Sequence, residues 1–115
     1  MNPDCDPLIV SLGFDPETFA RLDGLRRAHF PPDRNVIPAH LTLFHKLPGE
    51  RVSDVCRALK RVADETPVFA IHVSGLRHLG RGVALGVEAP ELIAARARLA
   101  DVFAEDLTAQ DRQGF

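Results

Sequence analysis

A histidine that can transfer a proton and a threonine that can bind an oxyanion stand two positions apart in an apolar stretch of the chain. They are His40 and Thr42, within residues 37–43. The apolar residues around them predict a strand, in which side chains two positions apart point to the same face. An imidazole can take up or release a proton near neutral pH, and a hydroxyl can hold an oxyanion. The pair therefore has the chemistry of one half of a phosphoester-cleaving site.

Two further histidines need to be weighed against His40. His45 lies an odd number of positions away, so we expect it on the opposite face of the strand and not in a metal site shared with His40. His72 and Ser74 repeat the histidine–hydroxyl spacing in another predicted strand. They are a candidate second copy of the motif, but we favour an ordinary half-exposed strand position for His72.

The sequence holds no other recognisable catalytic motif. It has no glycine-rich phosphate loop, no serine nucleophile elbow and no cluster with metal-ligand spacing. The chemistry that remains is acid–base catalysis by histidine, for which we expect neither a metal nor a cofactor. Cys5 and Cys56 fit no metal or redox spacing, which indicates a reducing compartment, and we expect Cys56 in the core as a small apolar residue.

These residues have to be positioned by elements whose order we predict as β-α-β-α-β-β-α. A first strand is expected over residues 8–14, followed by a helix capped by Asp15 and started by Pro16. The strand that carries His40 ends at Pro48. Residues 68–79 and 83–87 alternate in polarity around a glycine turn at 80–82, which predicts a β-hairpin.

Two helices should cover the strands through apolar faces. The first ends at Thr66 and has a stripe formed by Val52, Val55, Cys56, Leu59, Val62 and Ala63. The second begins at Pro90 and has an inner face formed by Leu92, Ala95, Leu99, Val102 and Phe103. Residues 108–115 are polar. Strands and helices in this order, with one hairpin, indicate an α+β or mixed α/β domain.

Length, charge and hydropathy narrow the classes of function. A chain of 115 residues is enough for one domain with one core. The net charge of −2 disfavours a protein that binds duplex DNA, although a local basic site could hold one or two phosphates. No apolar run approaches the ~18 residues of a membrane helix, and no signal peptide is visible. We therefore expect a cytoplasmic protein without a membrane partner.

Residues 37–43 resemble the first motif of the two-histidine (2H) phosphoesterase superfamily. More closely, residues 36–49, 75–83 and 107–115 are similar to a bacterial 2′-5′ RNA ligase-like group, and the similarity extends over nearly all of the chain from residue 8. The resemblance implies an α+β, bilobal fold with an antiparallel-rich sheet and helices on the outside. Each lobe would contribute one His-x-Thr or His-x-Ser strand to a central cleft.

The resemblance also implies an activity. Two histidines would act as a metal-free acid–base pair on a 2′,3′-cyclic phosphate or a 2′-5′ phosphodiester, while the two hydroxyls hold phosphate oxygens. Carried over to this chain, His40 is the catalytic residue and Thr42 is the substrate-binding residue. The expected partner is an RNA end or a small cyclic nucleotide.

The chain departs from the family pattern at its end. The second motif is expected just after the segment that resembles residues 111–115, whereas the sequence stops at Phe115. His72 is too close to His40 in sequence to replace it. We therefore expect residues 1–115 to form a single, C-terminally incomplete domain that lacks the last strand or strands. Its activity should be impaired, and its exposed sheet edge could promote oligomerisation.

Two alternatives remain open. The chain could be a non-catalytic remnant that binds nucleotide phosphates or a protein partner, or a structural α+β domain in which His40 is a core residue. Burial of His40 against leucines would favour the structural domain. A pocket that contains Nε2 of His40 and Oγ1 of Thr42 without apolar cover would favour phosphate binding.

Overall fold

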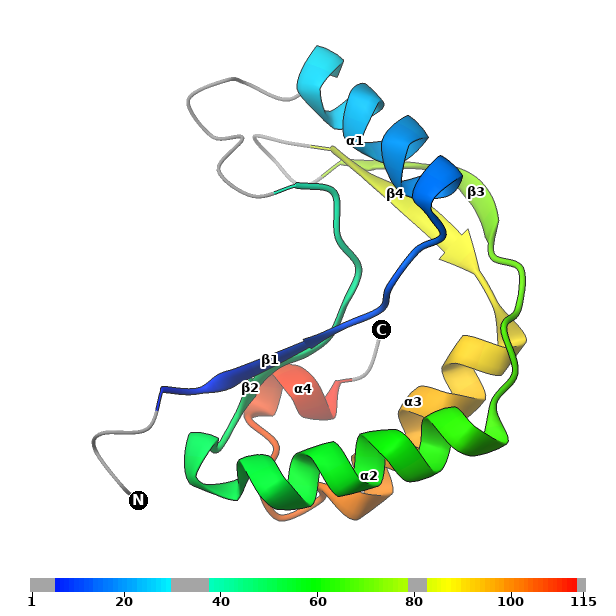
Figure 1. Ribbon diagram of the computed structural model, residues 1–115. Helices are drawn as coiled ribbons and strands as arrows, with labels where there is room; N and C mark the ends of the chain where they lie inside the picture. The colour runs from blue at the N-terminus through cyan, green and yellow to red at the C-terminus, as the bar shows by residue number, and fades with distance from the viewer. Residues whose placement is uncertain (1–5, 30–37, 79–82, 114–115) are drawn as a thin grey trace.

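The computed structural model describes residues 6–29, 38–78 and 83–113. Along the chain, the elements are β1 (Leu8–Ser11), α1 (Pro16–His29), β2 (Thr42–Leu47), the 3-10 turn η2 (Gly49–Arg51), α2 (Val52–Glu65), β3 (His72–His78), β4 (Val83–Glu88), α3 (Pro90–Val102) and α4 (Ala109–Arg112) (Figure 1). The α+β class is confirmed. The predicted turn at residues 80–82 lies outside the described residues.

The strands form two separate antiparallel pairs, β1 with β2 and β3 with β4. In Figure 1 the β1–β2 pair belongs to one arm of an open arch, together with α2, α3 and α4. The β3–β4 pair and α1 form the other arm. The antiparallel strands with helices on the outside agree with the fold expected from the sequence.

The β1–β2 pair contains two irregularities that matter for the site. Val10 pairs with Phe44 and Ser11 with Thr42, so one step along β1 corresponds to two steps along β2. A second shift lies between Leu8, which pairs with Leu47, and Val10. Each extra residue in β2 interrupts the alternation of faces that a regular strand would have.

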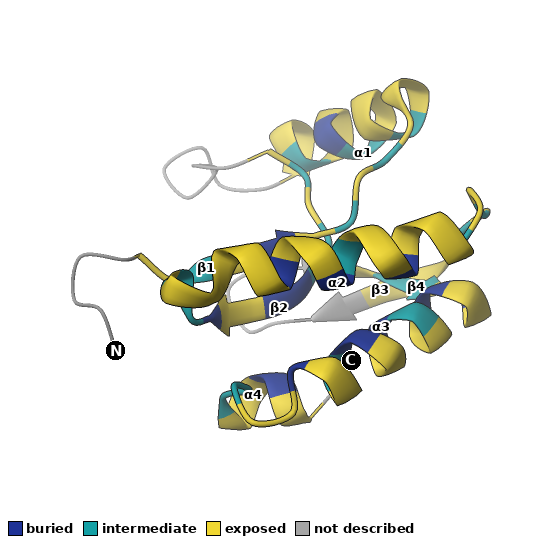
Figure 2. Ribbon diagram, turned by 60° about the horizontal axis from the view of Figure 1, so that its bottom comes forward, coloured by how far each residue is buried: buried dark blue, intermediate teal, exposed yellow. Residues whose placement is uncertain are grey.

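The core lies where β2 meets α2 and α3. Phe44 and Leu47 are completely buried, and the ring of Phe44 meets that of Phe103 edge to face with their centroids 5.6 Å apart. Figure 2 shows the buried residues of α2 and α3 facing each other and β2. An edge-to-face pair of this kind adds about 0.5–1.5 kcal/mol to the free energy gained by burying the rings.

Two helical faces differ from the prediction. On α2 the buried residues are Val55, Ala58 and Val62, whereas Cys56 is exposed. The expectation that Cys56 lies in the core is therefore wrong, because the inward face is the 55–58–62 row and Cys56 lies about 100° further around the helix. On α3 the predicted inward Val102 is 57% exposed, and Arg96 is buried on the inner face instead.

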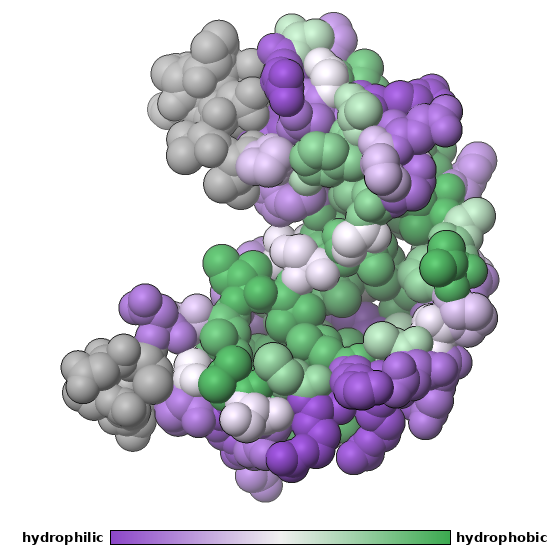
Figure 3. Space-filling view, viewed as in Figure 1, coloured by the Kyte–Doolittle hydropathy of each residue, from purple (hydrophilic) through white to green (hydrophobic). Residues whose placement is uncertain are grey.

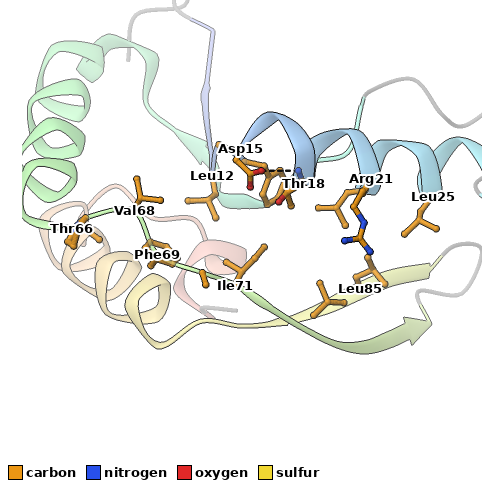
Figure 4. Close-up of a pocket in the computed structure, with 16 residues that line it drawn as sticks. Leu12, Asp15, Thr18, Arg21, Leu25, Thr66, Val68, Phe69, Ile71 and Leu85 are labelled. Carbon is orange, nitrogen blue, oxygen red and sulfur yellow. Dashed lines mark hydrogen bonds between the residues drawn. The ribbon is translucent and has the colours of Figure 1, made fainter.

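The other arm of the arch is less tightly packed. A cleft of about 700 Å³ separates α1 from the segment that leads into β3 and from β4. Figure 4 shows Thr18, Arg21 and Leu25 of α1 on one side of the cleft and Phe69, Ile71 and Leu85 on the other. Hydrophobic side chains also line the inner side of the arch in Figure 3. Within the described ranges, no helix combines the length and the apolar character needed to cross a membrane.

Candidate functional site

Thr42 is the first residue of β2, and His40 lies two residues before the strand begins. The backbone nevertheless continues the pairing: the N–H of Leu12 donates to the carbonyl of Leu41 at 2.9 Å, and Ser11 pairs with Thr42. The sequence predicted a strand already at His40. The structure places His40 at the entry to β2 and Thr42 inside it.

His40 is exposed, so the alternative that made it a core residue is wrong. Its Nδ1 lies 3.0 Å from the carbonyl oxygen of Pro38. A carbonyl oxygen only accepts, so Nδ1 carries the proton in this contact. The other ring nitrogen, Nε2, is then the atom through which His40 can take up a proton from a bound molecule.

Asp23 of α1 anchors the segment that carries His40. Its buried carboxylate accepts from the N–H of Ala39 at 3.0 Å and from the guanidinium of Arg27 at 2.6 Å. The hydrogen bond from Ala39 is the main cause of a lowered pKa for Asp23, and Arg27 lowers it further. The helix that precedes β2 in the sequence thus fixes the residue next to His40. Sequence reasoning missed Asp23, for which the spacing to Arg27 was the available signal.

Thr42 and His45 line the same small cavity, of about 200 Å³. Its lining consists of Thr42, Leu43, His45, Arg96, Gln110, Asp111 and Gln113. We expected His45 on the face opposite to His40 and Thr42. That expectation fails for Thr42 because β2 has an extra residue between Thr42 and Phe44, and an extra residue reverses the parity of the positions that follow.

Asp111 of α4 lines the same cavity and is almost completely buried, with only 1% of its surface exposed. Its carboxylate accepts from the N–H of His45 at 2.9 and 3.1 Å and from the N–H of Lys46 at 3.1 Å. The Nδ1 of His45 lies 3.3 Å from Oδ1. Burial alone would raise the pKa of Asp111, but these hydrogen bonds lower it below 3.8. The carboxylate therefore remains charged and holds the middle of β2.

Arg96 connects α3 with the same region. Its Nε donates to the carbonyl of Leu43 at 3.1 Å and a terminal nitrogen donates to the carbonyl of Asp111 at 2.7 Å. The guanidinium carbon also lies 4.3 Å from the centroid of the Phe44 ring. Arg96 thus fixes β2, α3 and α4 relative to one another. No local sequence signal points to Arg96 or to the burial of Asp111, because both depend on long-range contacts.

The second histidine–hydroxyl pair lies elsewhere. Val73 pairs with Val87 and Gly75 with Gly86, so Ser74 is an extra residue in β3 and has no pairing partner in β4. His72 and Ser74 are exposed and belong to the other sheet. The structure thus does not bring them into the cavity beside Thr42. Among the described residues, no three histidine, cysteine, aspartate or glutamate side chains are grouped so that they could hold a metal ion.

A comparison with known protein families assigns the chain to one family. The family model of the 2′-5′ RNA ligase superfamily matches residues 14–115, which include β2, the Asp23 anchor, Arg96 and Asp111. Neither the curated proteins nor the solved structures contain a match to this chain. Since the family match covers most of the sequence, the chain belongs to the 2′-5′ RNA ligase superfamily.

Proposed function

We propose that this chain binds the phosphate of a 2′,3′-cyclic phosphate or a 2′-5′ phosphodiester at an RNA end or in a small cyclic nucleotide. Thr42 holds a phosphate oxygen, and His40 transfers a proton. The observation that carries the proposal is the exposed His40 imidazole, whose Nδ1 is engaged by the Pro38 carbonyl so that Nε2 is left for the substrate. Membership of the 2′-5′ RNA ligase superfamily supports the same chemistry.

Hydrolysis of a cyclic phosphate defines what His40 has to do. Water attacks phosphorus, the bond from phosphorus to one ribose oxygen breaks, and a phosphomonoester remains. One group takes the proton from the water, and another gives a proton to the departing oxygen. With a proton on Nδ1, His40 presents Nε2 to the substrate and acts as the base through that atom.

We propose that the chain on its own turns over slowly. Its 115 residues contain a single His-x-Thr pair, at His40 and Thr42. A positioned proton-transfer group contributes about 10²–10⁴-fold to a rate. A site with one such pair should therefore be slower, by a factor of this size, than a site with two.

The test uses 2′,3′-cyclic AMP in the presence of EDTA, with the phosphomonoester product measured by chromatography. We expect His40→Ala to lower the rate by about 100-fold or more. We expect Thr42→Val, which keeps the shape and removes the hydroxyl, to weaken substrate binding. His29→Ala is the matched control, because His29 is an exposed histidine at the end of α1. Equal rates for the wild type and His40→Ala would contradict a catalytic role for His40.

A non-catalytic phosphate-binding protein is the second candidate, and the single His-x-Thr pair is the observation that favours it. In that case the protein releases no product above the uncatalysed rate, but it still binds the phosphomonoester in a way that depends on Thr42. Calorimetric titration of the wild type and of Thr42→Val with adenosine 2′-monophosphate separates this function from a chain that does not bind phosphate at all.

Self-association through a sheet edge is also part of the proposal. β1 pairs with β2 alone, so one edge of β1 has no partner strand in the described part of the chain. An exposed edge presents N–H and C=O groups that can pair with another chain. Sedimentation equilibrium over a range of concentrations tests this. A strictly monomeric protein at high concentration would contradict it.

A further inference from the structure

We propose that His45, held in place by Asp111, is a second phosphate-binding residue of the Thr42 site. The ligand class is a phosphate oxyanion, as in a phosphomonoester or a cyclic phosphodiester. This inference rests on the proposed function and adds to it a contact from a residue outside the His-x-Thr motif.

The orientation of the His45 ring is fixed from one side. Asp111 accepts from the backbone N–H of His45 and also lies 3.3 Å from the ring Nδ1 of the same residue. An ionised carboxylate only accepts, so Nδ1 is the donor in this contact. The ring nitrogen that remains, Nε2, is directed away from the carboxylate and is available to a ligand.

Burial differs sharply between the two partners. The side chain of Asp111 is 1% exposed, whereas that of His45 is 52% exposed. Both carboxylate oxygens of Asp111 have hydrogen-bond donors without the imidazole, since the backbone N–H groups of His45 and Lys46 already donate to them. The exposed imidazole of His45 is thus held in place by the buried carboxylate of Asp111. A carboxylate that accepts from one ring nitrogen orients a histidine so that the other nitrogen can bind a ligand.

The cavity beside the ring is suited to an anion. Besides Thr42 and His45, its lining includes Gln110 and Gln113, whose side chains carry amides, and Arg96, whose guanidinium already donates to the carbonyls of Leu43 and Asp111. Hydroxyl, imidazole and amide groups can all donate hydrogen bonds. The one acidic group in the lining is Asp111, whose oxygens accept from the backbone of β2. A phosphate held by Thr42 therefore lies within a region of hydrogen-bond donors that also contains His45.

The most informative variant is His45→Asn. The side-chain N–H of asparagine occupies about the position of Nδ1, so the contact with Asp111 can be kept while Nε2 is removed. A residue that only supports the fold would tolerate this change without loss of binding. We expect the Kd for adenosine 2′-monophosphate, measured by calorimetric titration, to rise by about 10-fold. His72→Asn, at an exposed histidine of β3, is the matched control and should leave the Kd unchanged.

A second measurement does not depend on any substitution. In the wild-type protein, we expect adenosine 2′-monophosphate to shift the ring Cε1–Hε1 NMR signal of His45, while the signal of His72 stays in place. If Thr42→Val weakens binding but His45→Asn does not and the His45 signal is unmoved, the inference is overturned and the proposed function stands. If the wild-type protein does not bind the nucleotide, both the inference and the proposed function are refuted.

Discussion

Replacing Asp111 by Asn tests whether one buried carboxylate holds β2 in place. The substitution keeps the size of the side chain but exchanges one accepting oxygen for an NH₂ group. Asp111 receives the N–H groups of both His45 and Lys46, so at least one of these donors would face another donor. Leaving a buried donor unsatisfied costs about 1–3 kcal/mol, and loss of the charge weakens the remaining bonds by about 1 kcal/mol. We expect a total loss of about 2–4 kcal/mol.

This loss of unfolding free energy can be converted into a decrease in melting temperature. An unfolding entropy of about 2.1 cal/mol/K per residue gives roughly 0.24 kcal/mol/K for 115 residues. The melting temperature of Asp111→Asn should therefore fall by about 8–17 °C, as measured by circular dichroism at pH 7. Asp64→Asn is the matched control. Asp64 is an exposed partner of Lys60 on α2, where an ion pair contributes roughly 0.5 kcal/mol or less.

The pH dependence gives a second check on the same variant. The pKa of Asp111 is lowered in the folded protein, so its contribution is fully present above the ordinary carboxyl value of 3.8 and is lost as the pH falls through the lower folded value. The gap in stability between the wild type and Asp111→Asn should therefore narrow between pH 7 and pH 3. A gap that is the same at both pH values, or a melting temperature equal to that of Asp64→Asn, would refute the reasoning.

Two further substitutions probe the support of the site. Asp23→Ala leaves the N–H of Ala39 without its partner, so we expect the His40-dependent hydrolysis of 2′,3′-cyclic AMP to slow several-fold, less than in His40→Ala. An unchanged rate would remove Asp23 from the positioning of His40. Phe44→Ala empties a completely buried position that meets Phe103 and should cost about 3–5 kcal/mol in urea unfolding. A loss below about 1 kcal/mol would show that the core does not depend on this ring.

The starts of α1 and α3 and the end of α2 could be predicted from the sequence because their signals are local, whereas α4 was not predicted. Asp15 accepts from the N–H of Thr18 at 3.0 Å, as an N-cap does, and α1 begins at Pro16. α2 ends at Glu65, just before the predicted stop, and α3 begins at Pro90. Proline and capping residues act on the backbone within one turn, so the sequence contains the whole cause.

The support of the candidate site could not be predicted in the same way. Asp111 contacts His45 across 66 positions and Arg96 contacts Leu43 across 53. Asp111 lies in a polar stretch and Arg96 among the alanines of α3, and a charged residue at either place ordinarily indicates a solvated surface. They are buried because each forms hydrogen bonds with backbone groups of β2. No local sequence pattern indicates these long-range hydrogen bonds. The parity argument for His45 failed for a related reason, since an extra residue in a strand depends on its pairing partner.

The contact between Asp111 and β2 also has a consequence for the order in which the molecule is made. Proteins emerge from the ribosome from the N-terminus, so β2 leaves the ribosome long before residues 108–112 do. Until the turn that carries Asp111 is synthesised, the N–H groups of His45 and Lys46 have no carboxylate to receive them. The strand that begins with Thr42 therefore reaches its final form late in synthesis. A nascent chain released before Asp111 would contain His40 and Thr42 but would lack the carboxylate contacts that hold β2 in its folded position.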